Sequence, residues 1–291
     1  MNTINKINKN PKKWLEKSFQ SDIKNYDTIN KGFYESNLFL EKTQNGLLNI
    51  MKEYVKNTDA NILDAGCGTG GFLIAAASDH YEKIYGIDVH RKSILRAVAR
   101  FKIYNKEVNI IQGNAIKMPF KNDFFDFIVC VGMIEHIIGR DKRQKIMNEF
   151  FRILKPGGFI FLITHPNKYF PYDMHYGLPF INWLPKKLKF YIAKKFAPDR
   201  VSNIFVTSNV SEMELISYIK RYIESYDSVW WKLLEYNLRF ESKSPKSDPF
   251  LGNIGRFIND YKLVNLVVLI SKILCKFSLS LSICLVIKKK I

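Results

Sequence analysis

The sequence has few cysteines and lacks any long apolar run. Its four cysteines form neither a CxxC pair nor a disulfide-like pattern. We therefore expect no disulfide framework and no zinc site, and a reducing compartment fits best. Lysines at 262, 272 and 276 interrupt the most apolar segment, residues 261–287, so no stretch reaches the roughly 18 to 20 apolar residues of a membrane span. The first residues contain no apolar run of signal-peptide length, which predicts a cytoplasmic protein.

Acidic residues are scarce relative to basic ones. The sequence has 45 Lys and Arg against 27 Asp and Glu, a formal net charge of +18. Such an excess can mark a nucleic-acid or anionic-membrane partner. Lysine is spread along the whole chain, however, and no RNA-reading module is present. A compositional bias is the favoured explanation, and a nucleic-acid partner stays a less favoured alternative.

The apolar content predicts one substantial domain with elaborations. The chain has 291 residues, 47% of them hydrophobic, and no internal repeat. Short β-rich runs alternate with helical stretches, and we expect strands at residues 61–64, 84–88, 108–112, 125–131 and 159–164. This alternation predicts an α/β fold with a doubly wound, mostly parallel sheet and helices on both faces.

The segments around this alternation predict a division into four parts. Residues 1–36 form a basic N-terminal arm that becomes helical near Trp14, and residues 37–164 form the main α/β domain, which opens with a helix. Residues 165–253 begin with a Pro-rich and aromatic lid and continue into a helix from Ser211 to Ile223, where Glu214 completes a capping box. Residues 254–291 form a helix and a last strand, expected at 279–287.

A glycine-rich turn follows the first expected strand. Residues 62–72 read ILDAGCGTGGF, in which the glycines allow positive φ angles and close backbone approach to a ligand. The glycines at 66, 68 and 71, with Asp88 about 20 residues on, also satisfy the dinucleotide fingerprint, so an NAD-dependent oxidoreductase is an alternative. Asp64 argues against this, because a carboxylate repels a pyrophosphate but attracts an ammonium group.

Further motifs follow in order: LDAGCGTG (63–70), YGIDVH (85–90), GNAIKMPF (113–120), FDFIVCVGMIEHI (125–137) and RILKPGGFIFLITHPN (152–167). With them the sequence resembles the class I S-adenosylmethionine-dependent methyltransferases, and among these the type 11 small-molecule group, over residues 45–167. The resemblance implies a Rossmann-like sheet of seven strands, a lid insertion after the fifth strand, and S-adenosylmethionine as cofactor. Residues 37–164 would then be the cofactor-binding domain.

The resemblance also implies a set of cofactor-binding residues. The methionine part would lie against Asp64, Ala65, Gly66, Cys67, Gly68 and Gly70. Asp88 would accept hydrogen bonds from the ribose hydroxyls, Val89, Asn114 and Ala115 would contact the adenine, and Val131 would line the pocket. For Asp64 and Asp88 the competing interpretation is an ordinary helix-cap or turn role.

Three residues are candidates for catalysis. His136 follows the fourth expected strand, at the edge where ligands of open α/β sheets bind, and a histidine can accept a proton near neutral pH. Asp173 and His175 lie in the lid and would contact or deprotonate the acceptor; the alternative is that they only pin the loop. Some relatives bind a divalent metal through a Glu-rich version of the segment at Glu135, but only Glu135 and His136 are present, and we expect no metal.

Residues 184–196, LPKKLKFYIAKKF, form a basic amphipathic pattern. Its apolar residues share one helical face and its lysines surround them. Such a helix can lie in a membrane interface, although core packing with solvated lysines is the favoured interpretation. The expected acceptor is a small molecule, lipid or glycan, with oxygen as the expected methylated atom and RNA as an alternative acceptor. A membrane contact would place the protein at the inner face of the membrane.

Overall fold

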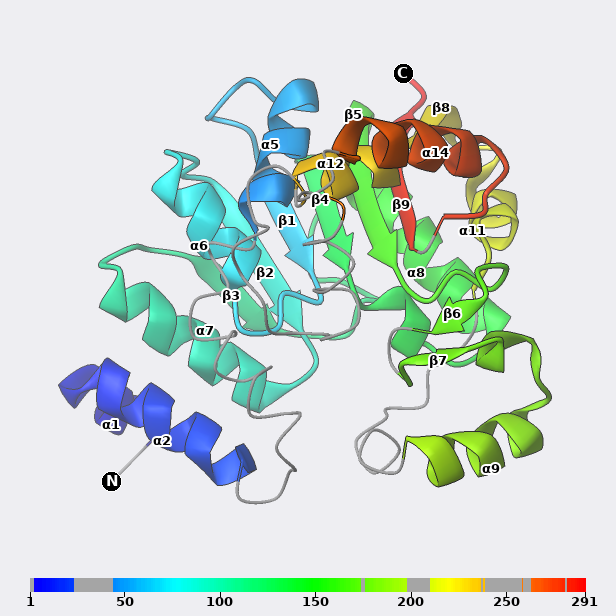
Figure 1. Cartoon of the computed structure of the whole chain (residues 1–291). Coiled ribbons are helices and arrows are strands. Elements are labelled where there is room, and N and C mark those ends of the chain that lie inside the picture. The colour runs from blue at the N-terminus through cyan, green and yellow to red at the C-terminus, as the bar shows by residue number, and fades with distance from the viewer. Residues whose placement is uncertain are drawn as a thin grey trace.

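A seven-stranded sheet forms the centre of the molecule. The computed structural model describes residues 3–23, 44–173, 176–197, 210–236, 238, 258, 263–280 and 282–291 (Figure 1). The strand order is β3-β2-β1-β4-β5-β9-β8. The strands are β1 Ile62–Ala65, β2 Ile84–Asp88, β3 Asn109–Gln112, β4 Phe125–Val131, β5 Leu154–Thr164, β8 Ile223–Ser228 and β9 Ile283–Lys289. β1 to β5 are parallel, whereas β9 runs antiparallel to both β5 and β8, so the predicted doubly wound fold is confirmed.

Helices cover both faces of this sheet. The helices α5 Asn45–Tyr54, α6 Gly71–Ser78 and α12 Trp230–Tyr236 contribute to one apolar core, and α8 Arg140–Ile153 and α11 Glu212–Ile219 contribute to the other. Neighbouring strand residues alternate between the two cores: Ile62 belongs to the first and Leu63 to the second, and both are fully buried. Strands that are buried on both faces explain the continuous apolar runs in the sequence.

The N-terminal residues form two helices, α1 Thr3–Lys9 and α2 Pro11–Ile23, which lie beside α7 Arg91–Ile103 (Figure 1). Ile7 and Leu15 are buried and pack in one cluster with Ala99 of α7. Arg96 donates hydrogen bonds to the hydroxyl and the carbonyl oxygen of Ser18. The expectation that this arm becomes helical only near Trp14 is therefore wrong, because α1 begins at Thr3 and its Ile7 packs against α7.

The expected element boundaries hold for some segments and fail for others. β2 and β4 have the predicted bounds, whereas β5 begins five residues early because the LKPGG segment is already extended. The Ser211 side chain accepts a hydrogen bond from the Glu214 N–H at 3.2 Å, which confirms the predicted cap. α11 ends at Ile219, and the strand β8 follows it unforeseen.

The C-terminal segment contains α14 Val264–Lys276 and β9, which begins four residues after the expected position. Most of the residues expected to start this helix, from 254 onward, lie outside the described part of the chain.

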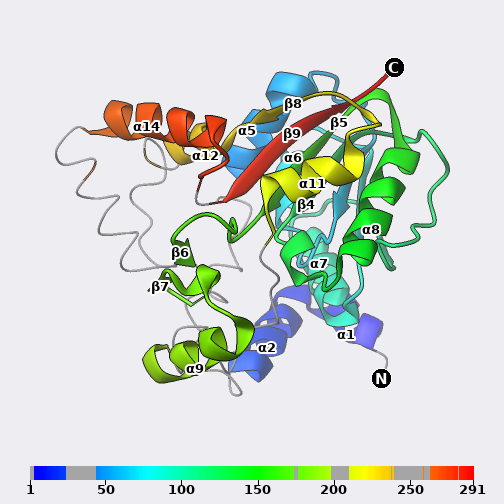
Figure 2. The same cartoon turned by 90° about the vertical axis from the view of Figure 1, so that its right-hand side faces the viewer.

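The expected lid region follows β5. β6 Tyr172–Asp173 and β7 Leu178–Pro179 pair as a small antiparallel sheet, followed by the short helix η2 Ile181–Trp183 and by α9 Lys186–Phe196. Figure 2 shows these elements on the same side of the molecule as α14. Because β1, β2, β4 and β5 are parallel, their carboxyl ends share one edge of the central sheet, and the lid begins from that edge.

Candidate active site

The glycine-rich turn connects β1 to α6 at the carboxyl edge of the sheet. Gly66 and Gly70 have φ angles of 79° and 77°, and Gly70 is the N-cap of α6. A Cβ at Gly66 would lie 3.0 Å from the Met133 side chain, and one at Gly70 would lie 3.1 Å from the Cβ of Ala97. The turn thus requires glycine both for its backbone conformation and for its close packing.

Asp88 fixes the shape of this turn. Its Oδ2 accepts a hydrogen bond from the Gly68 N–H at 2.9 Å, and its Oδ1 accepts one from the His90 N–H at 2.7 Å. Asp88 therefore does have the structural role in a turn that was the alternative to ribose binding. A carboxylate has about four acceptor positions, so these two bonds leave capacity for ligand hydroxyls.

Arg100 supports the turn from α7, and sequence reasoning missed it. Its side chain is fully buried and donates hydrogen bonds to the carbonyl oxygen and the hydroxyl of Thr69, at 3.3 and 3.1 Å. A buried arginine needs partners for its donors, and here the backbone of the glycine-rich turn supplies one. In the sequence, the clue to this role was an arginine among the apolar residues of the helix that follows β2.

Asp64 lies buried at the end of β1. Burial raises the pKa of its carboxyl group to about 7, and the nearby charge of Asp88 adds to the shift. A buried carboxylate is costly without a positive partner, and a ligand ammonium group at this position would supply one. A pyrophosphate would instead add negative charge beside two aspartates.

The other expected cofactor residues occupy different environments. Cys67 packs in the apolar core beneath the turn, and burial raises the pKa of its thiol far above its usual range. Val89 is 57% exposed just after β2, and Val131 is half-buried at the end of β4. Asn114 Oδ1 accepts a hydrogen bond from the Ile116 N–H at 2.9 Å, which forms a turn that presents Ala115.

Three polar side chains meet at the carboxyl ends of β4 and β5. Glu135 is fully buried and accepts a hydrogen bond from the Thr164 hydroxyl at 2.8 Å. Its other oxygen lies 3.6 Å from Nε2 of His165, within ion-pair distance of a protonated imidazole. Sequence reasoning did not pair these residues, since their positions are 30 apart and only the parallel register of β4 and β5 joins them.

The predicted catalytic residues do not gather in one place within the described part of the chain. His136 is exposed at the end of η1 Ile134–His136, close to the end of β4. Asp173 is fully buried in the lid, where its Oδ2 lies 3.2 Å from Nζ of Lys189, which also donates to Asn182. This ion pair favours the pinning interpretation of Asp173 over a catalytic one. His175 lies outside the described residues.

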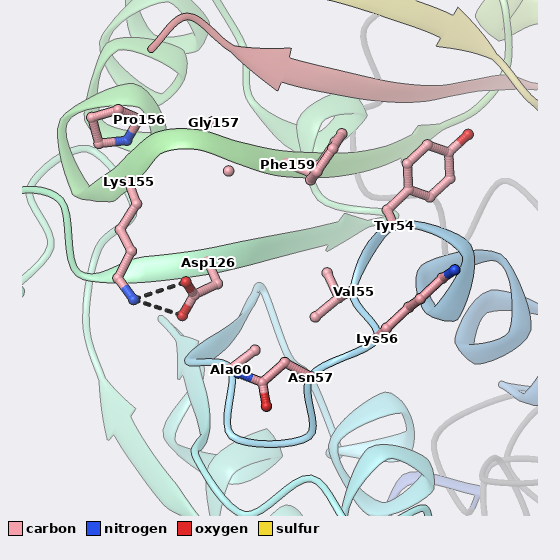
Figure 3. A pocket seen from close by; sticks show the side chains of 11 residues that line it. Tyr54, Val55, Lys56, Asn57, Ala60, Asp126, Lys155, Pro156, Gly157 and Phe159 are labelled. Atoms are coloured by element: carbon pink, nitrogen blue, oxygen red, sulfur yellow. Dashed lines mark hydrogen bonds and ion pairs between the residues drawn. The ribbon is translucent and has the colours of Figure 1, made fainter.

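Metal ligands do not cluster in the described regions: no three His, Cys, Asp or Glu side chains there form a group that could hold an ion. A pocket of about 280 Å³ lies elsewhere, at the amino ends of β1 and β4 (Figure 3). Asp126 and Lys155 form an ion pair there at 2.8 Å. The parallel strands place this pocket at the edge opposite the glycine-rich turn, so it is not the cofactor cradle.

Comparison with known proteins identifies the domain. Residues 62–158 match a family model described as a methyltransferase domain. The chain is 34% identical over 102 residues to the 24-methylenesterol C-methyltransferase 3 of Arabidopsis thaliana, which covers 33% of this chain and 26% of that protein. It is 29% identical over 189 residues to the demethylmenaquinone methyltransferase of Lactococcus lactis subsp. lactis (strain IL1403), covering 63% of this chain and 69% of that protein.

A solved structure has the same fold. The geranyl diphosphate C-methyltransferase from Streptomyces coelicolor A3(2), in complex with Mg²⁺, geranyl diphosphate and S-adenosyl-L-homocysteine, superposes with a TM-score of 0.52. The match covers 85% of this chain and 79% of that one, at 14% sequence identity, and it therefore shows the fold alone.

The sheet order and the glycine-rich turn define a Rossmann-like protein that binds a nucleotide-type cofactor at its carboxyl edge. Within this class, residues 62–158 are a methyltransferase domain, and the matched relatives support an S-adenosylmethionine-dependent methyltransferase of class I. These matches give the NAD-dependent oxidoreductase no support. Because the chain spans only 26% of the sterol methyltransferase, the acceptors of these relatives remain properties of those proteins.

Proposed function

We propose that this protein transfers a methyl group from S-adenosylmethionine to a hydroxyl oxygen of a small-molecule or lipid acceptor. The observation that carries the proposal is the buried Asp64 beside the glycine-rich turn, with Asp88 fixing that turn. A carboxylate with a raised pKa at the end of β1 is complementary to an amino-acid ammonium group.

The residues that would hold the cofactor are those implied by the resemblance. Asp64 and the backbone of residues 65–70 suit the methionine part, and Asp88 suits the ribose hydroxyls. Val89, Asn114, Ala115 and Val131 would enclose the adenine side, because all four lie at or just beyond the carboxyl ends of their strands.

The expected chemistry is an in-line displacement. S-adenosylmethionine supplies a methyl group already activated by a positive sulfur. The protein's part is then to orient the acceptor, exclude water and remove a proton when the acceptor is a hydroxyl. The carboxyl ends of β4 and β5 offer imidazole groups for that proton, at His136 and at His165, where the Glu135 carboxylate would stabilise an imidazolium.

The acceptor class is supported less directly than the cofactor. Two of the relatives are named as methyltransferases of a sterol and of demethylmenaquinone, which are apolar molecules. The exposed apolar and basic side chains of α9 also suit a lipid-type acceptor reached at a membrane surface. Glycans and RNA stay as alternative acceptors.

Calorimetry with the purified full chain tests the cofactor. S-adenosylhomocysteine should bind with one site per chain, NAD should not bind, and Asp64→Asn should weaken S-adenosylhomocysteine binding. Asp59→Asn is a matched control, because Asp59 is exposed and lies before β1. A folded protein that binds neither S-adenosylmethionine nor S-adenosylhomocysteine contradicts the proposal.

A second assay tests the acceptor and the base. Release of S-adenosylhomocysteine is followed with lipid, quinone, glycan and RNA fractions, and the active fraction names the acceptor class. With that acceptor, His136→Asn, His165→Asn and His175→Ala are compared over a range of pH. The variant that removes the acidic limb of the kcat profile identifies the base, and unchanged turnover in all three contradicts base catalysis by these histidines.

A further inference from the structure

The outer face of α14 presents an apolar stripe to solvent. Its residues recur at three- and four-residue steps along the helix, and all are between 47% and 69% exposed: Leu266, Leu269, Ile270, Ile273 and, just past the helix end, Phe277. The opposite face is buried through Val268, Ser271 and Cys275. The helix therefore has two apolar faces, one that packs against the rest of the molecule and one that is exposed to solvent.

The lid presents a second apolar surface. Trp183, Phe190, Tyr191 and Phe196 are between 56% and 64% exposed, and Leu188 is also exposed. Inside the lid, Lys189 is buried on Asp173. Core packing, the favoured interpretation of residues 184–196, is therefore wrong for Leu188, Tyr191 and Phe196, which are exposed. More than half of the exposed large apolar side chains among the described residues lie in residues 180–196 and 266–279.

The charged residues of the two helices have one sign. Neither α9 nor α14 contains an acidic residue, whereas α9 carries five lysines and α14 carries Lys272 and Lys276. Nζ of Lys272 lies 4.1 Å from the centre of the Trp231 ring. This basic group therefore borders an apolar surface. With a net charge of +18, a second copy of the chain would be repelled here, and an anionic surface would be attracted.

The two helices lie on one side of the molecule. In Figure 1 and in Figure 2, β6 and β7 lie between α14 above and α9 below. No helix in the described part of the chain is long and apolar enough to cross a bilayer.

We propose that residues 180–196 and 264–279 form a two-helix surface that lies in the interface of an anionic lipid bilayer. The aliphatic stripe of α14 enters the boundary of the acyl chains, the Trp and Tyr side chains of the lid lie at the level of the headgroups, and the lysines contact anionic lipid. This surface is a binding property that does not depend on the proposed activity. The proposed surface combines the basic amphipathic segment of residues 184–196 with a second helix, α14.

Vesicle flotation of the full chain tests the proposal. At low salt the protein should float with vesicles of phosphatidylcholine and phosphatidylglycerol, and it should stay at the bottom of the gradient with pure phosphatidylcholine. At about 1 M salt, where the Debye length is about 3 Å, the bound fraction should fall. The double variant Ile273→Ser with Phe277→Ser should lower partitioning about tenfold, since each side chain loses apolar area that the bilayer would bury.

The double variant Ile4→Ser with Met213→Ser is the matched control, because both residues are at least half exposed and lie on α1 and α11. It should float like the unchanged protein. Absence of flotation with anionic vesicles, or equal flotation of both double variants, overturns the proposal. So does a stable dimer in sedimentation velocity that only the Ile273→Ser, Phe277→Ser variant loses, since the stripe would then bind a second copy.

Discussion

Cofactor binding should be linked to the release of a proton from Asp64. In the free protein the pKa of this carboxyl is about 7, so the group is mostly protonated below that pH. An ammonium group binds well only to the ionised form. The affinity for S-adenosylhomocysteine should therefore be constant above pH 7 and fall about tenfold for each pH unit below it.

The size of the effect follows from the proton balance. At pH 6, one unit below this pKa, about 0.9 of the sites carry the proton and must release it on binding, whereas at pH 8 the figure is about 0.1. Calorimetry in buffers of different ionisation enthalpy measures this number directly. The raised pKa arises mainly from burial, so a bound ammonium that compensates the charge should return it toward the ordinary value of 3.8.

Two controls separate Asp64 from other titrating groups. Methylthioadenosine lacks the amino-acid part, so its affinity should not vary with pH in this range. Asp64→Asn should bind S-adenosylhomocysteine more weakly and release no proton. The reasoning is refuted if the unchanged protein shows the same affinity at pH 6 and pH 8, or if methylthioadenosine shows the same pH dependence as S-adenosylhomocysteine.

Three further predictions concern stability and the glycine-rich turn. Asp64 has a raised pKa in the folded state, so its stabilising contribution is complete below about pH 3.8 and is lost as the pH rises through 7. Asp64→Asn should therefore stabilise the free protein at pH 8, by on the order of 4 kcal/mol, and not at pH 4, as denaturant titration can measure. Gly66→Ala should reduce S-adenosylhomocysteine affinity about tenfold, because the added Cβ clashes with Met133 and the positive φ angle is strained for alanine. Gly68→Ala introduces only the backbone strain and should lose less affinity, so equal losses would contradict the packing argument. Lys189→Met should destabilise the fold by about 3 to 5 kcal/mol, because it removes the cation that is paired with the buried Asp173. Thermal unfolding measures this loss, and Lys187→Met, at an exposed position on the same helix, should have little effect.

The sequence predicts the fold around the glycine-rich turn well, since its information is local. The turn at residues 62–72 combines strand, glycines and helix start in one stretch, and Asp88 ends the next strand of the sheet. β8 was missed because most of its side chains are polar and exposed, so it has no apolar run. It is a strand only because β9 supplies its hydrogen-bond partners.

The acceptor half depends on contacts that sequence patterns do not carry. Glu135 and His165 meet across two parallel strands, and Arg100 reaches the glycine-rich turn from another helix. The apolar periodicity of residues 184–196 was visible, but periodicity alone does not show whether an apolar face meets the core or the solvent. The exposure of Tyr191 and Phe196 required the structure.

The position of β9 has a consequence for folding. This strand comes last in the sequence, yet it lies between β5 and β8 and pairs with both. Until residues 283–289 are in place, β5 keeps an open apolar edge and β8 has no strand to pair with, so the β5 and β8 parts of the sheet are joined only when β9 inserts between them.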